Sequence, residues 1–340
     1  MKAVQIVKPE ELRIIDMEKP RITERDNVLV KLKAAGICGS DVGIYHGENA
    51  AATYPRVIGH EIVGEVVEAG PTAKKVKVGD RVIIDQVTNC GHCWACRHNR
   101  PNVCQNLQVR GVHIDGGYRE YMAVPDVDCY LLPDSLSYTD AVMIEPTTIA
   151  VQVCSRAELT RDDMMIVIGA GAQGKSILKI AKLYHPKKLI MADLDDQKLK
   201  ECLEMGATDV INPGKENLIE RVRELTDGYG TTVTVDCAFY KGSLLNACEV
   251  SGNAGRVMVL GFSVAPDEIN QFVITSKELD LRGSRLQNRK FQSVIDMVNR
   301  GAVDLQGSVS HTFHYLDAQK AFDFNDTRDP SIRKIAFTFD

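Results

Sequence analysis

The segment "MMIVIGAGAQGKSILKIAKLYHPKKLIMADLDD", residues 164–196, constrains the fold of this 340-residue chain more than any other segment. Its apolar start, residues 164–168, suits a buried parallel strand, and apolar residues recur at helical spacing after the glycines. A second apolar run then ends at Asp193. A strand, a turn, a helix and a strand in this order predict one unit of a doubly wound parallel sheet, and therefore an α/β fold.

The turn of this unit has the spacing G-x-G-x-x-G, formed by Gly169, Gly171 and Gly174, and Asp193 follows 19 residues later. The first glycine permits a tight turn, the second lets a pyrophosphate approach the backbone, and the third lets the helix pack on the strand. N–H groups at the start of the helix attract the phosphates. Asp193 should accept hydrogen bonds from the ribose hydroxyls and repel a 2′-phosphate, so the pattern predicts NAD rather than NADP.

Four further residues are expected near this cofactor. Gln173 lies within the glycine turn, and Lys198 lies either along the adenine edge or as a solvated charge on a helix. Gly261 and Phe262 belong to the strand pattern "RVMVLGFS", at the strand end where ligands of such sheets bind. We therefore expect this pair to border the nicotinamide.

A second feature is the stretch "CGHCWACRHNRPNVC", residues 90–104, with the spacing C-x2-C-x2-C-x7-C. Four thiolates are a common ligand set of tetrahedral zinc, whereas iron–sulfur clusters use other spacings and a redox pair would leave two cysteines unexplained. A closed site of this kind has no open position for a substrate, so we expect a structural zinc that orders a lobe of about residues 88–106. Its ligands would be Cys90, Cys93, Cys96 and Cys104.

Composition narrows the class of protein. Ten cysteines without a secretory signal pattern favour thiols and metal ligands in a cytoplasmic protein, and no apolar run has the length of a membrane span. The formal net charge of −5 gives no electrostatic reason to expect nucleic acid or a membrane surface as a partner. The cysteines expected to be core thiols are Cys129, Cys154, Cys202, Cys237 and Cys248.

Upstream of the cysteine lobe, "AAGICGSD" holds Cys38 and "GHEIVGEVVEAG" holds His60 and Glu61. Each residue type binds zinc, and three protein ligands with one exchangeable position describe a catalytic zinc. Taken singly, Cys38 could be a buried thiol and His60 a hydrogen-bonded histidine beside a strand. The glycine spacing G-H-E-x2-G-x5-G favours the metal site instead.

These segments, together with "VGDRV", "DGGYREY" and "IEP", resemble the zinc-containing medium-chain dehydrogenases over almost the whole chain. The resemblance implies a mainly-β, GroES-like catalytic domain formed by residues 1–148 and 285–340. It also implies a Rossmann domain that binds NAD, formed by residues 149–284. A chain of this length suits two domains. The implied activity is that of a zinc- and NAD-dependent alcohol dehydrogenase.

The same resemblance implies roles for individual residues. Cys38, His60 and Glu61 would hold the catalytic zinc, and Glu145 would be a fourth, switchable ligand or would hold the zinc-bound water. A metal site with two acidic residues, Glu61 and Glu145, resembles the sites of the polyol and sugar-acid branch of the family, which includes sorbitol and L-threonine dehydrogenases. Two zinc ions and one NAD per chain follow as the expected cofactors.

The proton relay resembles that of the family only in part. Ser40 matches the relay hydroxyl of the family, two residues after the zinc-ligand cysteine. Many relatives carry a histidine five residues after that cysteine, where this sequence has Gly43. His46 could replace it, although we favour a surface position for His46.

Tyr45 and Arg285 match positions that line the substrate pocket of polyol dehydrogenases. "GSR" at 283–285 resembles the L-galactonate and L-gulonate 5-dehydrogenases and the starvation-sensing dehydrogenases, and a guanidinium can hold a carboxylate with two hydrogen bonds. We therefore expect oxidation of a secondary alcohol, at C5 of a hexonate or in a polyol, to a keto product. The alternatives are an L-threonine 3-dehydrogenase, a sorbitol or galactitol dehydrogenase, and a non-catalytic nucleotide sensor. By the same resemblance a homo-oligomer, dimer or tetramer, is expected.

Overall fold

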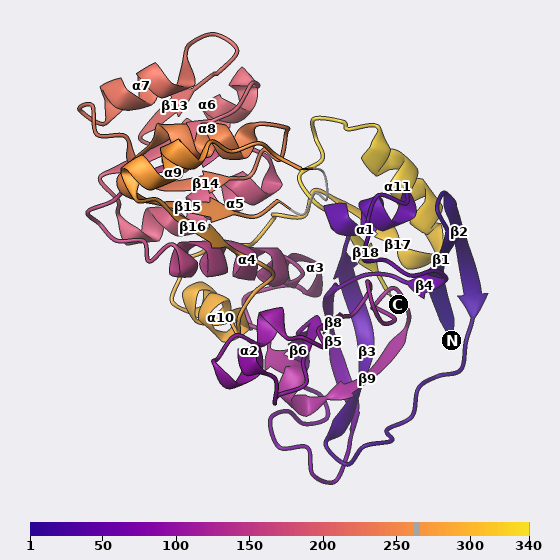
Figure 1. Cartoon of the computed structure of the whole chain (residues 1–340). Coiled ribbons are helices and arrows are strands. Elements are labelled where there is room, and N and C mark those ends of the chain that lie inside the picture. Colours follow the sequence, from indigo (N-terminus) through magenta and orange to yellow (C-terminus); the bar gives the residue numbers. More distant parts are fainter. Residues whose placement is uncertain (262–265, 340) are drawn as a thin grey trace. The chain divides into compact units, whose positions relative to one another are not determined.

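The computed structural model describes residues 1–261 and 266–339. The chain divides into two compact units, coloured along the sequence in Figure 1. Unit 1 comprises Met1–Pro146 and Phe291–Asp340, and unit 2 comprises Thr147–Lys290. Phe262, expected beside the nicotinamide, lies outside the described residues.

Unit 1 is built around a seven-stranded sheet of order β10-β6-β5-β3-β18-β17, with β9 also paired to β3. A three-stranded sheet, β2-β1-β4, and a two-stranded sheet, β7-β8, complete its β-structure. The strands are β1 Lys2–Lys8, β2 Glu11–Asp16, β3 Asn27–Gly36, β4 Arg56–Val57, β5 Glu61–Ala69, β6 Arg81–Ile84, β7 Val87–Thr88, β8 Gln108–Val109, β9 Tyr121–Pro125, β10 Cys129–Leu131, β17 His311–His314 and β18 Ile335–Thr338.

The helices of unit 1 are short and lie outside its main sheet. The helix α10 buries the apolar face that the spacing of Phe291, Val294 and Val298 predicts. The α-helices are α1 Gly39–Tyr45, α2 Trp94–Arg97, α3 Tyr138–Ala141, α10 Phe291–Asn299 and α11 Ala318–Asp326; the 3-10 turns are η1 Pro101–Val103, η2 Asp126–Asp128 and η4 Tyr315–Asp317.

Strand β3 is central to the main sheet of unit 1, because three strands, β5, β9 and β18, pair with it. Its C-terminal residue Gly36 lies opposite Glu61 of β5 on one side and Ala336 of β18 on the other. The strand is almost wholly buried, as its run of alternating and consecutive apolar residues predicts. Segments about 270 residues apart in sequence therefore meet at the end of one strand.

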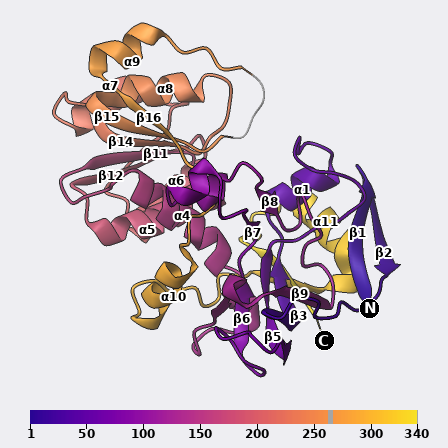
Figure 2. The same ribbon diagram turned by 60° about the horizontal axis from the view of Figure 1, so that its bottom comes forward.

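Unit 2 is a six-stranded, fully parallel sheet of order β13-β12-β11-β14-β15-β16. This order is that of a doubly wound fold, and it confirms the predicted fold class. Figure 2 shows α7, α8 and α9 on one face of the sheet and α5 on the other. The elements are α4 Ile144–Arg156, which begins in unit 1, β11 Met164–Ile168, α5 Ala172–Ala181, η3 Lys182–Tyr184, β12 Lys188–Ala192, α6 Asp196–Met205, β13 Asp209–Ile211, α7 Leu218–Leu225, β14 Thr231–Asp236, α8 Ser243–Val250, β15 Ser251–Val259, α9 Gln271–Lys277 and β16 Asp280–Gly283.

The glycine turn of unit 2 depends on one close backbone approach. A Cβ at Gly174 would lie 1.9 Å from the carbonyl oxygen of Gly169, and Gly169 itself has a φ of 104°. Gly171, in contrast, has no atom of the described residues within 4 Å of its ideal Cβ and has an ordinary φ of −70°. Gly169 and Gly174 are therefore required by the fold, whereas Gly171 leaves open space before α5.

This difference gives a first prediction. Gly174→Ala should lower the Tm of the cofactor-free protein by several degrees, because helix α5 must move away from the turn; an overpacked core site costs about 1–3 kcal/mol. Gly171→Ala, the matched control, should leave that Tm nearly unchanged. Thermal unfolding followed by circular dichroism measures both. Equal Tm values for the two variants would show that the close approach does not limit stability.

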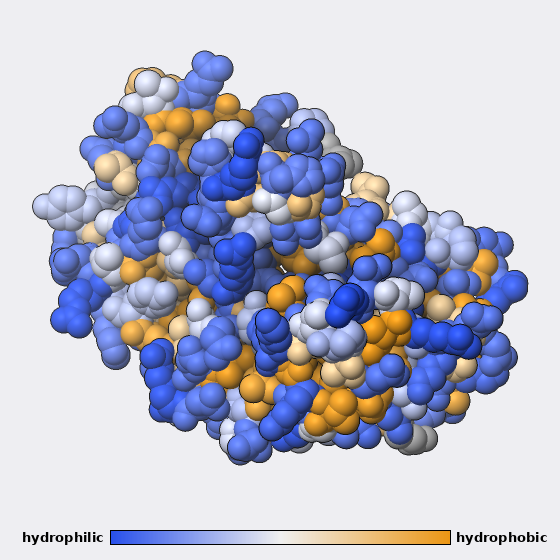
Figure 3. All heavy atoms as spheres, turned by 90° about the horizontal axis from the view of Figure 1, so that it is seen from below, coloured by the Kyte–Doolittle hydropathy of each residue, from blue (hydrophilic) through white to orange (hydrophobic). Residues whose placement is uncertain are grey.

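The surface is mixed in character. Hydrophilic residues dominate the face shown in Figure 3, with hydrophobic residues gathered in smaller areas between them. Among the described residues, none of the helices combines the length and the apolar character that crossing a membrane requires.

Candidate functional site

The four cysteines of residues 90–104 lie together on a loop lobe around α2. The Sγ atoms of Cys93 and Cys96 are 3.5 Å apart, those of Cys93 and Cys104 are 3.8 Å apart, and those of Cys104 and Cys90 are 3.5 Å apart. A disulfide needs about 2.05 Å. Tetrahedral zinc with bonds of about 2.3 Å needs sulfur atoms separated by about 3.8 Å. The spacing therefore excludes disulfides here and fits zinc.

Backbone N–H groups prepare this lobe for thiolates. The N–H groups of Cys90 and Asn106 both donate to the sulfur of Cys104, at 3.3 Å. Hydrogen bonds from the backbone of Gln105 and Cys96 lower the pKa of Cys93 to about 6. Thiolate, the form that binds metal, is thus favoured at Cys93 before a cation arrives, whereas burial raises the pKa of Cys96 to about 12.

Loss of one ligand should remove one zinc ion only. We expect Cys104→Ser to retain one zinc per chain where the wild type retains two, and to make residues 90–104 sensitive to protease, because the lobe has little apolar core. Elemental analysis and limited proteolysis measure this. Cys129→Ser, which alters a fully buried thiol outside both clusters, is the control and should keep both ions. Full zinc content in Cys104→Ser would contradict the assignment.

A second cluster gathers Cys38, His60 and Glu61, whose ligand atoms all lie within 4.8 Å of one another. Cys38 precedes α1, His60 follows Gly59, and Glu61 is the first residue of β5. His60 is 7% exposed and Glu61 is fully buried. A buried carboxylate beside a thiol and an imidazole fits a metal ligand set.

Close backbone packing holds His60 in place. A Cβ at Gly59 would lie 2.2 Å from the ring of Tyr118, and one at Gly111 or Gly116 would lie within 2.7 Å of the backbone of Gly59. Only glycine allows the loop that carries Gly111 and Gly116 to lie directly on the Gly59–His60 peptide. The glycine spacing around the histidine therefore has a packing cause.

The sequence analysis missed Asp41, which organises this cluster. Its buried carboxylate accepts hydrogen bonds from the N–H groups of Cys38 at 2.9 Å and Gly59 at 3.2 Å, and Oδ2 lies 3.0 Å from the hydroxyl of Tyr118. Asp41 Oδ1 lies 3.4 Å from His60 Nδ1, which leaves Nε2 for a metal. The signal was present in "GICGSD", whose acid lies three residues after the cysteine.

The cluster attracts cations. Burial alone would lower the pKa of His60, but the charges of Asp41 and Cys38 outweigh it and raise that pKa well above its ordinary value. The buried Asp41 stays ionised, because the charge of His60 and its hydrogen bonds lower its pKa against the effect of burial. A cation of higher charge than a proton would be held here more strongly still.

Glu61 has a cationic partner that the sequence did not indicate. Lys334, the residue before β18, donates from Nζ to Glu61 Oε1 at 2.5 Å, and Nζ lies 2.5 Å from Oε2. Burial would lower the pKa of Lys334, but the charges of Glu61 and Cys38 raise it, so the side chain is an ammonium. A lone lysine in "RKIAFTF" carries no pattern from which this contact could be predicted.

Glu145, expected as a fourth ligand, is not part of the three-residue set. It lies near the start of α4, 4% exposed, and Gln86 Nε2 donates to its Oε1 at 2.5 Å. Burial raises the pKa of Glu145 to about 8, and the charge of Glu61 adds to this effect. A direct bond from Glu145 to metal therefore remains a proposal, and Gln86 is a second residue that sequence reasoning missed.

The expected relay and substrate residues in and directly after helix α1, which are Ser40, Tyr45 and His46, differ in their surroundings. Ser40 lies half-buried in the first turn of α1. Tyr45 is 7% exposed, packs on the ring of Phe322, and its hydroxyl accepts a hydrogen bond from Gln319 Nε2 at 3.1 Å. His46 lies 2.7 Å from Glu10 Oε1 through Nδ1 and 3.2 Å from Asp326 Oδ2 through Nε2. Both nitrogens of His46 are thus engaged by acids outside the metal-ligand set.

His46 gives a prediction with a definite sign. The hydrogen bond to Glu10, followed by the contacts with Asp326, raises the pKa of His46. The stability that this charge contributes is fully present below the unfolded pKa of about 6.5 and is lost as pH rises through the raised folded value. His46→Gln should therefore lower Tm at about pH 6 and match the wild type at about pH 9.

The dependence of activity on pH should not change in His46→Gln, because both ring nitrogens are committed to acids. A Tm difference that is the same at all pH values would show that charge is not the cause. A shifted pH profile of activity would instead restore His46 as a proton carrier.

The expected cofactor residues surround the glycine turn of unit 2. Asp193 directly follows β12, and its carboxylate accepts the N–H groups of Ala170 at 2.7 Å and Asp195 at 3.0 Å. Helix α5 begins after Gly171 without a side-chain cap, and Gln173 Nε2 is buried with no hydrogen-bond partner among the described residues. Uncapped helical N–H groups over an open glycine fit a pyrophosphate.

Three other predicted residues, Lys198, Gly261 and Arg285, lie outside the glycine turn. Lys198 Nζ is 3.8 Å from Asp195, with its side chain 44% exposed, as a solvated helix charge would be. Gly261 is exposed after β15. Arg285 is half-buried and follows β16, within unit 2.

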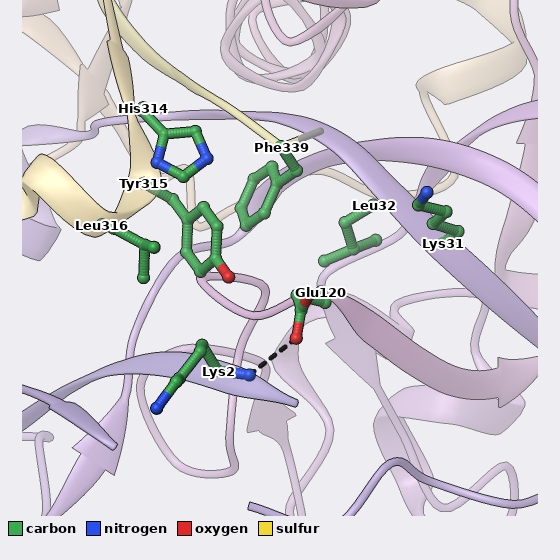
Figure 4. Close-up of a pocket in the computed structure, with 8 residues that line it drawn as sticks. All are labelled: Lys2, Lys31, Leu32, Glu120, His314, Tyr315, Leu316 and Phe339. Atoms are coloured by element: carbon green, nitrogen blue, oxygen red, sulfur yellow. Dashed lines mark hydrogen bonds between the residues drawn. The ribbon is translucent and has the colours of Figure 1, made fainter. Parts of the chain in front are cut away.

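A pocket of about 250 Å³ lies elsewhere in unit 1 (Figure 4). Tyr315 and Phe339 stack at its wall, with ring centroids 4.6 Å apart, and the Lys2 N–H donates to Glu120 at 2.7 Å. None of the expected metal, relay, cofactor or substrate residues that the structure describes lines it. The pocket is therefore separate from the candidate chemistry.

Comparison with known proteins agrees with this geometry. Residues 24–134 match the family description "Alcohol dehydrogenase GroES-like domain", and residues 172–300 match "Zinc-binding dehydrogenase". The chain is 39% identical to the starvation-sensing protein RspB of Escherichia coli K12, over 100% of this chain and 99% of that protein. It is 29% identical to a sorbitol dehydrogenase of Bacillus subtilis, over 95% and 93% of the two chains.

A solved structure covers the whole chain as well. The crystal structure of rspB from E. coli CFT073, complexed with NADH, is 39% identical and superimposes with a TM-score of 0.93 over 100% of this chain and 99% of that one. The expected family is confirmed. The chain belongs to the zinc-dependent medium-chain alcohol dehydrogenases, a family of nicotinamide-dependent oxidoreductases.

Proposed function

We propose that this protein oxidises a secondary alcohol of a sugar acid, at C5 of a hexonate such as L-galactonate or L-gulonate, or of a polyol, to a ketone with NAD. The observation that carries the proposal is the set of Cys38, His60 and Glu61, whose donor atoms lie within 4.8 Å of one another and of which His60 and Glu61 are buried. One thiolate, one imidazole and one carboxylate leave a coordination position for an alcohol. Such a set is suited to catalysis, whereas the four-cysteine lobe is closed.

The zinc ion would supply Lewis acidity that makes the alcohol proton easier to remove near neutral pH. Four side chains of the protein would act around this zinc ion. Asp41 orients His60, Lys334 and Gln86 hold Glu61 and Glu145, and Ser40 is proposed to pass the proton outward. Because Glu145 has a raised pKa of about 8, its carboxyl group could also take up a proton within this site.

Unit 2 is proposed to bind the dinucleotide through the uncapped start of α5 and the glycines before it. The acid at Asp193 supports NAD over NADP, because a 2′-phosphate would meet a carboxylate and two more acids, Asp195 and Asp196. The relative solved with NADH supports the same choice. Hydride transfer itself is the chemistry of the cofactor, and the protein aligns the alcohol carbon with it.

The substrate class rests on less specific observations. Arg285 offers a guanidinium that could hold the carboxylate of a hexonate. A neutral polyol is supported by the sorbitol dehydrogenase relative at 29% identity. L-Threonine remains the second candidate, since an L-threonine 3-dehydrogenase is 30% identical over 95% of this chain. A homo-oligomer and a cytoplasmic location also remain predictions.

A screen of substrates tests this function. The zinc-loaded protein is assayed for NADH absorbance with L-galactonate, L-gulonate, sorbitol, galactitol and L-threonine, each with NAD and with NADP. We expect the highest kcat/KM with a hexonate and NAD. Turnover of L-threonine alone would replace the proposal with the second candidate. No turnover of any compound by protein containing both zinc ions would favour a nucleotide sensor.

Arg285→Ala separates recognition of the carboxylate from a structural role. Loss of a charged hydrogen-bonded pair costs about 1.5–3 kcal/mol, so kcat/KM should fall at least tenfold for hexonates and much less for polyols. Arg300→Ala, an exposed arginine after α10, is the control. An equal loss on hexonates and polyols would show that Arg285 does not bind the carboxylate.

A further inference from the structure

We propose that Lys334 competes with the catalytic metal for the carboxylate of Glu61, and thereby makes Glu61 an exchangeable ligand. The inference rests on the proposed metal set, but it does not depend on which alcohol is the substrate. Its starting observation is geometric. Lys334 Nζ lies 2.5 Å from both oxygens of Glu61, so one ammonium covers both atoms that could bind the metal.

The ion pair of Glu61 and Lys334 lies directly beside Gly36. Glu61 lies opposite Gly36 on β5, and Lys334 precedes β18, whose Ala336 lies opposite Gly36 on the other side. A Cβ at Gly36 would lie 1.8 Å from Glu61 Oε2 and 3.0 Å from Lys334 Cε. Any side chain at residue 36 would therefore occupy the space in which the two charges meet. The backbone hydrogen bond from Ile37 N–H to Ile335 O, at 2.9 Å, fixes the two segments together.

Burial makes the pair strong enough to matter. The Glu61 side chain is fully buried and that of Lys334 is 12% exposed. In such a place an ion pair is weakly screened, and removal of one partner leaves an uncompensated charge. The pair is not a surface contact of negligible energy.

The effect on the metal follows from charge. Cys38 as a thiolate and Glu61 as a carboxylate would give a dication two negative charges, and the ammonium of Lys334 cancels one of them. A dication and an ammonium that share one carboxylate also repel each other. Lys334 should therefore weaken the hold of Glu61 on the metal, so that another oxygen ligand can take its position. A lysine with a purely structural role would have the opposite effect, because its loss would loosen the site.

Zinc release distinguishes these two roles without any measurement of activity. The test compares wild type with Lys334→Met, which keeps the length of the side chain and removes its charge. Zinc release to a chromogenic chelator should have two phases, one for each cluster. We expect the phase of the catalytic site to be about tenfold slower in Lys334→Met, and the phase of the cysteine lobe to be unchanged.

Three further variants serve as controls. Lys334→Arg restores the charge and should release zinc at close to the wild-type rate. Lys75→Met removes another lysine of unit 1, an exposed one that donates to Val127 O, and should have no effect. In Glu61→Gln the added change Lys334→Met should no longer slow release, because the shared carboxylate is gone. If Lys334→Met does not fold, Lys334→Gln replaces it in the same comparison.

A spectroscopic readout gives a second check. In the cobalt-substituted protein the d–d absorption band should differ between Lys334→Met and wild type, because Glu61 stays bound, and should not differ for Lys75→Met. Unchanged or faster zinc release in a folded charge-removing variant would overturn the inference and leave the metal set intact. Wild-type protein that binds only one metal ion per chain would overturn the metal set itself.

Discussion

The packing of charged groups around the end of strand β3 is the constraint on which the rest of unit 1 depends. Asp41, Glu61 and Lys334 are brought there by α1, β5 and the segment before β18, and none of them could be buried alone. Asp41 is satisfied by backbone N–H groups and Tyr118, and Glu61 is satisfied by Lys334. The sheet therefore pairs distant segments in the one arrangement that compensates these charges. The candidate metal site is a consequence of that compensation.

The two metal clusters differ because their environments differ. The cysteine lobe draws all its donors from fifteen consecutive residues, and its sulfur atoms already have the separation that tetrahedral zinc requires. The second cluster draws its donors from separate segments; its own carboxylate, Glu61, is held by a lysine, and the neighbouring carboxyl group of Glu145 is held by an amide. A closed local cluster stabilises a loop, whereas a cluster assembled from distant segments can keep one ligand exchangeable. The first is suited to structure and the second to chemistry.

Much of the fold could be predicted because its patterns are local. The apolar run before Gly169 became β11 with the predicted limits, and the glycine spacing reflected a real contact between Gly174 and the carbonyl of Gly169. The position of Asp193 at the end of β12 was also predictable, since the length of one helix separates it from the turn. Lys334 and Gln86 could not be predicted, because each acts on a residue at least 59 positions away and neither belongs to a spacing pattern.

The sequence by itself determined the donor types, the cysteine spacing and the strand–turn–helix unit, because these depend on side-chain chemistry and on periods of a few residues. Only the tertiary structure decided the partners of the buried charges: that His46 faces Glu10 and Asp326, that Asp41 lies against His60, and that Lys334 lies on Glu61. The physical reason is that strand pairing brings together residues from distant parts of the chain. The energy of a buried charge depends on those neighbours and not on its place in the sequence.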